Sequence, residues 1–510
     1  MTCPLLSAYL NTLLIAACLS ASPLAFTQTD DLAAESRHAK ELMADRRYAE
    51  AIPIYEHLVK TVPGNAGLLL NLALAEQMAG HPARAIPNFE AVLKAQPDNI
   101  PALASLSMAR LQLNQSREAI APLRKLVALA PKDLNALGML AGAELNENLL
   151  DDAAQHYRQL TLADDSDPRA WYGLGKSYEG LATRTFERLN KLAPQSAYVA
   201  VLLADTRLQR RQFRSAFFFY REAQKTLPDL PGLHAGLSFL YRETDHADWA
   251  AAEQKNEEAL PPPDCAEQAA ACAFLSGHPL DAVQTVPPTA SPAALFWVTK
   301  SYNQLAGSAF EHLSQLPESV QIHAMKAQTY RDHRQNGEAV KEWRAALALA
   351  PDDAKLKREL AAALFDAQDY QSALPLLQEL LTQEPKAPDL NFLMGTSLFR
   401  TEQAEKALPY LQLAVQGHED ILPADAALGL TLVTLTKYAE AIPYLKKALA
   451  LDDDGSLHYS LARAYRAAGQ TQLAAAKMEQ YQKIQKKNQE VNAELAKEAE
   501  ITGPPPPAEP

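Results

Sequence analysis

Two cysteines, Cys265 and Cys272, lie in the body of the chain and carry its most reactive side chains. Seven residues apart on one straight helix, their Cα atoms would be about 10 Å apart, too far for a disulfide bond. A disulfide therefore requires Cys265 to lie in a turn that folds back on a helix carrying Cys272. Two buried free thiols, or a metal-binding or redox-active pair, are the alternatives. The spacing is not C-x2-C, and no histidine pair lies nearby at ligand spacing.

The N-terminal segment suggests a different chemistry, since its first 29 residues carry no charged side chain and residues 10–19 are almost wholly apolar. This pattern is typical of an export signal. The run that ends at Cys18 also resembles the lipobox of bacterial lipoproteins, in which this thiol would receive a lipid. Removal of residues 1–25 as a soluble signal, with cleavage after Ala21 or Ala25, is the second interpretation, and an uncleaved anchor is the third.

These interpretations place the body of the protein outside the cytoplasm, in the periplasm or at the outer membrane. Contact with a membrane is expected only through the N-terminal lipid or anchor. In such a compartment the environment is oxidising, which favours a disulfide between Cys265 and Cys272.

The remaining polar residues do not form a recognisable catalytic pattern. The twelve histidines show no metal-ligand spacing, and the acidic pairs lie at expected turns. The formal net charge of −13, without a basic block, excludes nucleic acid as an expected partner. We therefore predict that the protein is not an enzyme and holds no metal or cofactor.

Proline, alanine and large apolar residues recur along this chain at a fixed period. Pro63, Pro97 and Pro131 recur every 34 residues, each preceded at the same distances by an alanine and a large apolar residue. This period is typical of stacked helical hairpins, each of which buries its apolar face only against its neighbours. The prolines are expected where one hairpin ends and the next begins. The fold class that follows is all-α.

Within this period, Trp171-x2-Leu174-Gly175-x2-Tyr178 resembles the first-helix signature of the tetratricopeptide repeat (TPR). Ala51-x3-Tyr55 and its equivalents resemble the second-helix signature. The resemblance covers residues 32 to 488 and implies a right-handed α-solenoid of stacked helix-turn-helix hairpins. A sequence like a phosphate-binding loop, residues 170–177, falls inside this signature. Its amides would be bonded within a helix and unable to hold a nucleotide.

The repeats are interrupted at corresponding places. Residues 176–192 and 300–316 are similar in sequence, and each lacks the turn of an ordinary hairpin; further similarities follow at the same offset of 123 residues. The chain thus contains an internal duplication. The predicted divisions are an N-terminal array (32–263), a degenerate hairpin or hinge (264–291), a C-terminal array with a capping helix (292–488) and a disordered proline-rich tail (501–510).

The resemblance implies that the first helix of each hairpin lines a concave groove that binds proteins or peptides. By repeat position, the candidate binding residues are Tyr172, Lys176, Phe239, Arg242, Arg331, Phe392, Tyr459 and Arg463. The predicted function is an extracytoplasmic scaffold for protein–protein interaction. The alternatives are an accessory protein of envelope polysaccharide synthesis or export, and a redox-active thiol protein. The sequence does not predict the oligomeric state.

Overall fold

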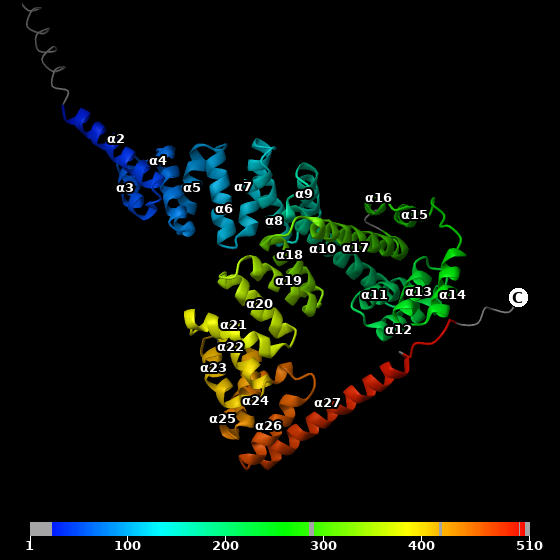
Figure 1. Ribbon diagram of the computed structural model, residues 1–510. Coiled ribbons are helices and arrows are strands. Elements are labelled where there is room, and N and C mark those ends of the chain that lie inside the picture. Colours follow the sequence, from blue (N-terminus) through cyan, green and yellow to red (C-terminus); the bar gives the residue numbers. More distant parts are fainter. Residues whose placement is uncertain (1–22, 285–289, 418–420, 499, 505–510) are drawn as a thin grey trace, which may run out of the picture. The chain divides into compact units, whose positions relative to one another are not determined.

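A computed structural model describes residues 23–284, 290–417, 421–498 and 500–504 (Figure 1). Within these ranges the chain forms 26 α-helices and no strand, as the all-α prediction requires. In the part that the structure describes, no helix has the length and apolarity needed to cross a membrane. Cys18 and most of the predicted signal lie outside the described residues.

The chain divides into two compact units, Met1–Gly180 and Leu181–Pro510, and the division falls within helix α10. Consecutive helices pack as antiparallel hairpins in each unit. The helices of the first unit are α2 (Pro23–Ala44), α3 (Tyr48–Thr61), α4 (Ala66–Met78), α5 (Pro82–Ala95), α6 (Ile100–Gln112), α7 (Ser116–Leu129), α8 (Leu134–Asn146), α9 (Leu150–Ala163) and the first part of α10 (Pro168–Leu192).

The second unit continues from α10 to the end of the chain. Its helices are α11 (Ala197–Gln209), α12 (Phe213–Thr226), α13 (Leu233–Glu243), α14 (Ala247–Glu258), α15 (Ala269–Leu275), α16 (Pro279–Gln284), α17 (Pro292–Gln315), α18 (Val320–Asp332), α19 (Asn336–Leu349), α20 (Ala354–Asp366), α21 (Tyr370–Gln383), α22 (Pro388–Arg400), α23 (Ala404–Gly417), α24 (Leu422–Thr434), α25 (Tyr438–Ala448), a 3-10 turn (Leu449–Leu451), α26 (Ser456–Ala467) and α27 (Thr471–Glu498).

The repeated apolar residues form the core between hairpins. The alanines and the large residues of the second-helix signature are almost fully buried, including Ala51 with Tyr55 and Ala85 with Phe89. Small residues allow neighbouring helices to approach closely. A Cβ atom at Gly395 would lie 2.6 Å from Cγ of Leu411, which shows how tightly α22 packs on α23.

Local signals with the same 34-residue period set the ends of the helices. Asn65, Asn99 and Asp133 are N-caps whose side chains accept hydrogen bonds from backbone amides of α4, α6 and α8. The turn inside each hairpin contains a residue with positive φ, as at Asn114 and Asn148. Capping and turn geometry therefore agree with the hydrophobic period, which fixes where each helix starts and stops.

The prolines are distributed differently from the prediction. Pro63, Pro97 and Pro131 do follow the ends of helices. A second set lies inside the second helices of the hairpins, where each proline removes one backbone hydrogen bond: Pro53, Pro87, Pro122, Pro375, Pro409 and Pro443. These helices continue past the proline because their apolar faces are buried against neighbouring hairpins.

The two interrupted repeats are long continuous helices. Residues 176–192 belong to α10 and residues 300–316 largely to α17, which span 25 and 24 residues. Since the residues of the inter-helix turn are absent from both sequences, the two helices of each ordinary hairpin are replaced by one helix.

The segment predicted as a degenerate hairpin or hinge, residues 264–291, lies inside the second unit, since the division between the units falls at Gly180–Leu181. The described part of this segment forms the short helices α15 and α16, which pack against α17. One hydrophobic core extends without a break from Leu189 on α10 to Trp297 on α17 and includes Ala270 and Ala271 of α15. The helix α15 therefore belongs to the hydrophobic core of the second unit.

The C-terminal end also differs in part from the prediction. The polar capping helix is the end of α27. Residues 501–504, which we call the C-terminal segment, follow it and contact α13 and α14, whereas the sequence predicts disorder from 501 onward. Residues 505–510 lie outside the described part of the chain.

Candidate functional site

Two predicted groove residues, Tyr172 and Lys176, lie on α10 and are half-buried. The Lys176 ammonium lies 2.7 Å from the carboxylate of Glu179, one turn further along. The neighbouring Ser177 hydroxyl donates to the Gly173 carbonyl at 2.8 Å, as in a regular helix. The stretch that resembles a phosphate-binding loop therefore has helical geometry.

The predicted residues Phe239, Arg242 and Arg331 have different surroundings. The ring of Phe239 is exposed, and the Arg242 guanidinium lies 5.9 Å from its centre, within cation–π distance. Arg331 instead bonds to Asp366 at 3.0 Å and to Glu359 at 3.4 Å. These ion pairs join α18 to α20, so Arg331 has a structural role within the array.

The last three predicted residues lie on α22 and α26. Phe392 is half-buried, with its ring 5.7 Å from that of Phe365. Tyr459 lies 5.3 Å from the ring of Tyr481, so α27 contacts it. Arg463 is exposed. Of the eight predicted residues, Tyr172 and Lys176 belong to the first unit and the other six to the second.

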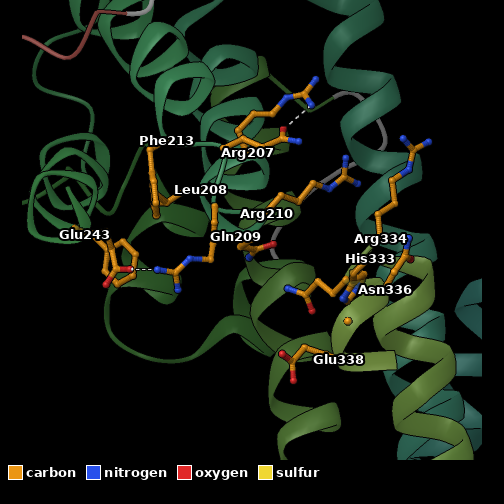
Figure 2. Close-up of a pocket in the computed structure, with 15 residues that line it drawn as sticks. Arg207, Leu208, Gln209, Arg210, Phe213, Glu243, His333, Arg334, Asn336 and Glu338 are labelled. Carbon is orange, nitrogen blue, oxygen red and sulfur yellow. Dashed lines mark hydrogen bonds and ion pairs between the residues drawn. The ribbon is translucent and has the colours of Figure 1, made fainter. Parts of the chain in front are cut away.

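A cavity of about 850 Å³ lies between two hairpin turns of the second unit. We call it the arginine pocket; its walls are residues 207–213 and 333–338, with Phe239 and Glu243 (Figure 2). Of the predicted groove residues, only Phe239 lines it. Sequence reasoning missed the others, although the dipeptides Arg210-Arg211 and His333-Arg334 are 123 residues apart and thus occupy equivalent positions in the duplication.

The charges of the arginine pocket are mainly positive. Arg211 bonds to Glu243 at 3.1 Å, and Arg207 donates to the amide oxygen of Gln212 at 2.9 Å (Figure 2). Within the described residues, the guanidinium groups of Arg210 and Arg334 have neither a hydrogen bond nor an ion pair. The pocket therefore presents two arginines whose hydrogen-bonding capacity is unused.

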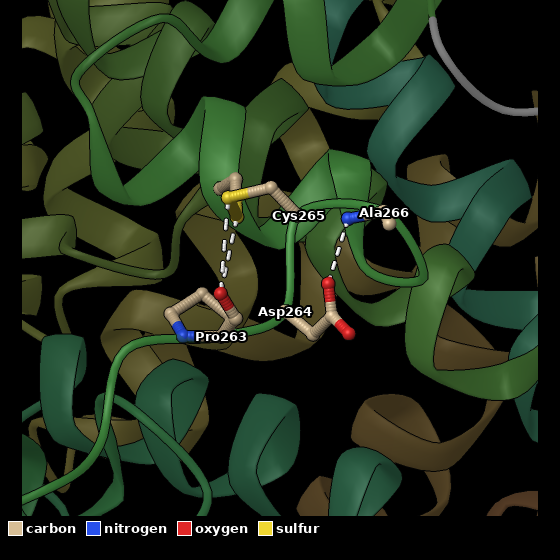
Figure 3. The surroundings of a disulfide bond; sticks show 5 residues. Pro263, Asp264, Cys265 and Ala266 are labelled. Atoms are coloured by element: carbon tan, nitrogen blue, oxygen red, sulfur yellow. Dashed lines mark hydrogen bonds between the residues drawn. A yellow bond between two sulfur atoms is a disulfide. The ribbon is translucent and has the colours of Figure 1, made fainter.

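Cys265 and Cys272 form a disulfide, with their Cα atoms 5.6 Å apart (Figure 3). Cys265 lies in the turn that precedes α15, and Cys272 lies on that helix. Asp264 stabilises the turn by accepting a hydrogen bond from the Ala266 amide at 2.9 Å. Cys265 is exposed and Cys272 is half-buried. No group of three potential metal ligands occurs in the part of the chain that the structure covers.

The C-terminal segment lies on three aromatic residues, Tyr241, His246 and Trp249, which we call the aromatic surface. The His246 and Trp249 rings stack with their centres 4.2 Å apart, and Tyr241 lies 5.5 Å from Trp249, edge to face. The Tyr241 hydroxyl donates to the Thr502 carbonyl at 2.6 Å. Burial raises the pKa of Tyr241 to about 12, so this hydroxyl remains a donor at neutral pH.

The next residue of the segment also contacts this surface closely. A Cβ atom at Gly503 would lie 3.0 Å from Cε2 of Trp249, so only glycine fits there without a shift. Ile501 packs on the hydrophobic core beneath.

Comparison with family models decides how this array is classified. Models described as tetratricopeptide repeat match residues 42–106, 105–168, 139–182, 293–424 and 426–489. The chain belongs to the tetratricopeptide repeat family. Residues 183–292, between the matches, include the aromatic surface and the disulfide.

Solved structures similar to this TPR protein include three that match most of their own length. MamA MSR-1 C2 is 18% identical over 33% of this chain and 98% of its own, with a TM-score of 0.29. YrrB, titled a TPR protein with an unusual peptide-binding site, is 22% identical over 35% and 92%, also with a TM-score of 0.29. A tetratricopeptide repeat protein from Parabacteroides merdae is 12% identical over 66% and 99%, with a TM-score of 0.31. No curated protein sequence matches this TPR chain.

Proposed function

We propose that this TPR protein is a scaffold outside the cytoplasm, and that it binds extended segments of partner proteins on exposed surfaces of its helical hairpins. Membership of the TPR family supports this function class. The observation that carries the proposal is the contact between the aromatic surface and the C-terminal segment, because here an extended segment already lies on the helices.

The contact uses features that many peptides share. The Tyr241 hydroxyl recognises a backbone carbonyl, and Trp249 accepts a residue without a side chain. A polar donor beside an aromatic face is also the arrangement by which proteins bind extended proline-rich segments. A partner with an apolar residue and, two positions later, a glycine would make the same contacts.

Peptide binding to the full-length protein tests this proposal. Gly503→Val places a branched side chain against Trp249 and should displace the C-terminal segment. The probe is a synthetic peptide with the sequence of residues 501–510, Ile-Thr-Gly-Pro-Pro-Pro-Pro-Ala-Glu-Pro. The readout is the ¹⁹F NMR spectrum of protein labelled with 5-fluorotryptophan, in which the Trp249 signal is assigned with Trp249→Phe.

We expect the Trp249 signal of the Gly503→Val protein to shift saturably with the peptide. Binding to the wild-type protein should be at least about tenfold weaker, since the tethered segment competes at high effective concentration. A peptide of the same composition in scrambled order is the control, and Gly307→Val is the matched variant because a Cβ atom there meets no neighbour. Absence of a shift, or an equal shift with the scrambled peptide, would contradict the proposal.

Two observations support a location outside the cytoplasm. The disulfide between Cys265 and Cys272 is of the kind that persists in oxidising compartments. The uncharged N-terminal segment is typical of an export signal. Mass spectrometry of the protein from its native cells tests the location. We expect a chain that starts at a lipid-modified Cys18, or after Ala21 or Ala25; an intact N-terminus in the cytoplasmic fraction would contradict it.

A further inference from the structure

We infer that the arginine pocket binds an acidic segment of a partner protein, one that presents two carboxylates beside an apolar side chain. The inference rests on the proposed scaffold function but concerns a second site, separate from the aromatic surface. Three features of the pocket support it: its origin in the duplication, its unused arginines and the exposed ring of Phe239.

The two walls of the pocket are equivalent turns of the internal duplication. One is the α11–α12 turn at residues 210–212, and the other is the α18–α19 turn at residues 333–335. Each contains an arginine with positive φ, 56° at Arg211 and 59° at Arg334. Because both turns have the same backbone form and basic side chains, the cavity between them is basic on both sides (Figure 2).

The charges on the walls leave two arginines for a ligand. The two carboxylates of the lining are engaged, since Glu243 bonds to Arg211 at 3.1 Å and Glu338 bonds to Lys341 at 2.7 Å. Arg210 and Arg334, which come from opposite walls, have no such partner among the described side chains. Guanidinium groups bind carboxylates through paired, charge-assisted hydrogen bonds. The lining of this cavity is mainly positive, whereas the chain as a whole has a net charge of −13.

The apolar part of the lining favours a peptide over a simple anion. Phe239 is 46% exposed at the pocket, and the ring of Phe213 lies beneath the Arg211 guanidinium at 5.6 Å. An apolar or aromatic side chain of a peptide would bury these rings, and its flanking carboxylates would meet Arg210 and Arg334. Nucleic acid would need a long basic surface, whereas the cations here are confined to one cavity.

Selection from a displayed library of random 12-residue peptides tests this inference on the full-length protein. Binders are selected on the wild-type protein after removal of those that also bind an Arg210→Glu/Arg334→Glu variant. We expect the retained peptides to be enriched in Asp and Glu next to Phe, Tyr, Trp or Leu. The strongest peptide is then synthesised, and its affinity is measured by calorimetry for single variants.

Arg210→Ala and Arg334→Ala should each weaken this peptide by about tenfold, since each removes one charge-assisted contact. Arg466→Ala is the matched control: it removes another exposed arginine, on α26, and should change the affinity less than about twofold. Circular dichroism confirms that each variant is folded. Alginate, a polymer of uronic acids, serves as a competitor of different chemistry.

The outcomes separate this inference from the scaffold function. Retained peptides without acidic residues, or affinities unchanged by Arg210→Ala and Arg334→Ala, overturn the acidic site while leaving peptide binding at the aromatic surface intact. Arginine-dependent binding of alginate with no acidic peptide selected also overturns it, in favour of a polysaccharide ligand. Failure of both this selection and the Gly503→Val titration would overturn the scaffold function itself.

Discussion

The ammonium group of Lys300 lies 3.0 Å from the carboxylate of Asp205, so an ion pair joins α17 to α11. The other oxygen of this carboxylate accepts a hydrogen bond at 2.6 Å from Tyr220, whose side chain is fully buried. Burial and the charge of Asp205 together raise the pKa of Tyr220. One carboxylate thus connects three helices of the second unit, α11, α12 and α17.

Replacement of this carboxylate should destabilise the second unit. Asp205→Ala leaves the buried Tyr220 hydroxyl without its acceptor, which we expect to lower the free energy of unfolding by about 2–3 kcal/mol. Urea denaturation followed by circular dichroism measures the change. In a Tyr220→Phe background the same substitution should cost clearly less, because no hydroxyl is then left unpaired. Equal costs in the two backgrounds would show that the two side chains are not coupled.

Close packing at Gly395 gives a second prediction. Gly395→Ala places a methyl group 2.6 Å from Cγ and 3.1 Å from the backbone nitrogen of Leu411, so α22 and α23 must separate. We expect a loss of about 1–3 kcal/mol in the free energy of unfolding. Gly307→Ala is the control, since its methyl group meets no neighbour and should stabilise α17 by up to about 1 kcal/mol. Similar effects of the two substitutions would contradict this account of the packing.

The pair formed by His234 and Glu253 predicts a dependence of stability on pH. Burial lowers the pKa of His234, but its hydrogen bond to Glu253 and the charges of Glu253 and Glu257 raise it more, so the net shift is upward. A raised pKa means that protonation stabilises the folded state. This contribution is complete below pH 6.5, the ordinary value, and is lost as the pH rises through the raised pKa.

Urea denaturation at several pH values between 6 and 9 tests this dependence. Above pH 6.5 the wild-type protein should lose stability with rising pH more steeply than His234→Gln does. The exposed His38 provides the control, and His38→Gln should retain the wild-type slope. A slope unchanged by His234→Gln would show that this imidazole does not carry the effect.

The disulfide should stabilise the region around α15 and α16. By chain entropy, closing so short a loop contributes about 2 kcal/mol. In the Cys265→Ser/Cys272→Ser variant we expect faster hydrogen exchange in α15 and α16, while α22 to α24 exchange as before. Thiol titration of the unfolded protein should detect two more thiols after reduction than before. Equal thiol counts would show that the two cysteines are not bonded in solution.

The fold could be predicted where the sequence repeats. Ala85 and Phe89 recur in equivalent form through the chain, and a 34-residue period is a strong constraint because every unit must pack on the next. The loss of a turn near Gly180 was also visible in the sequence. That it gives one continuous helix was not, since a deletion alone does not tell whether the helices fuse or the turn shortens.

The candidate sites were harder to predict, because they depend on contacts between distant residues. Arg210 and Arg334 are turn residues, and only the fold brings them to one cavity. Arg331, predicted by repeat position, is engaged by Asp366 and Glu359, which no periodicity indicates. The docking of Gly503 could not be predicted from composition, because it depends on a glycine opposite Trp249.

The contact of Thr502 and Gly503 with α13 and α14 has a consequence for how the second unit unfolds. A linear repeat array can lose its terminal hairpins one at a time, because each contacts only its neighbours. Here the residues that follow the final helix are held by hairpins more than two hundred positions earlier in the chain. Fraying at the C-terminus must first break this link. The last repeats thereby gain a cooperativity that nearest-neighbour stacking alone does not provide.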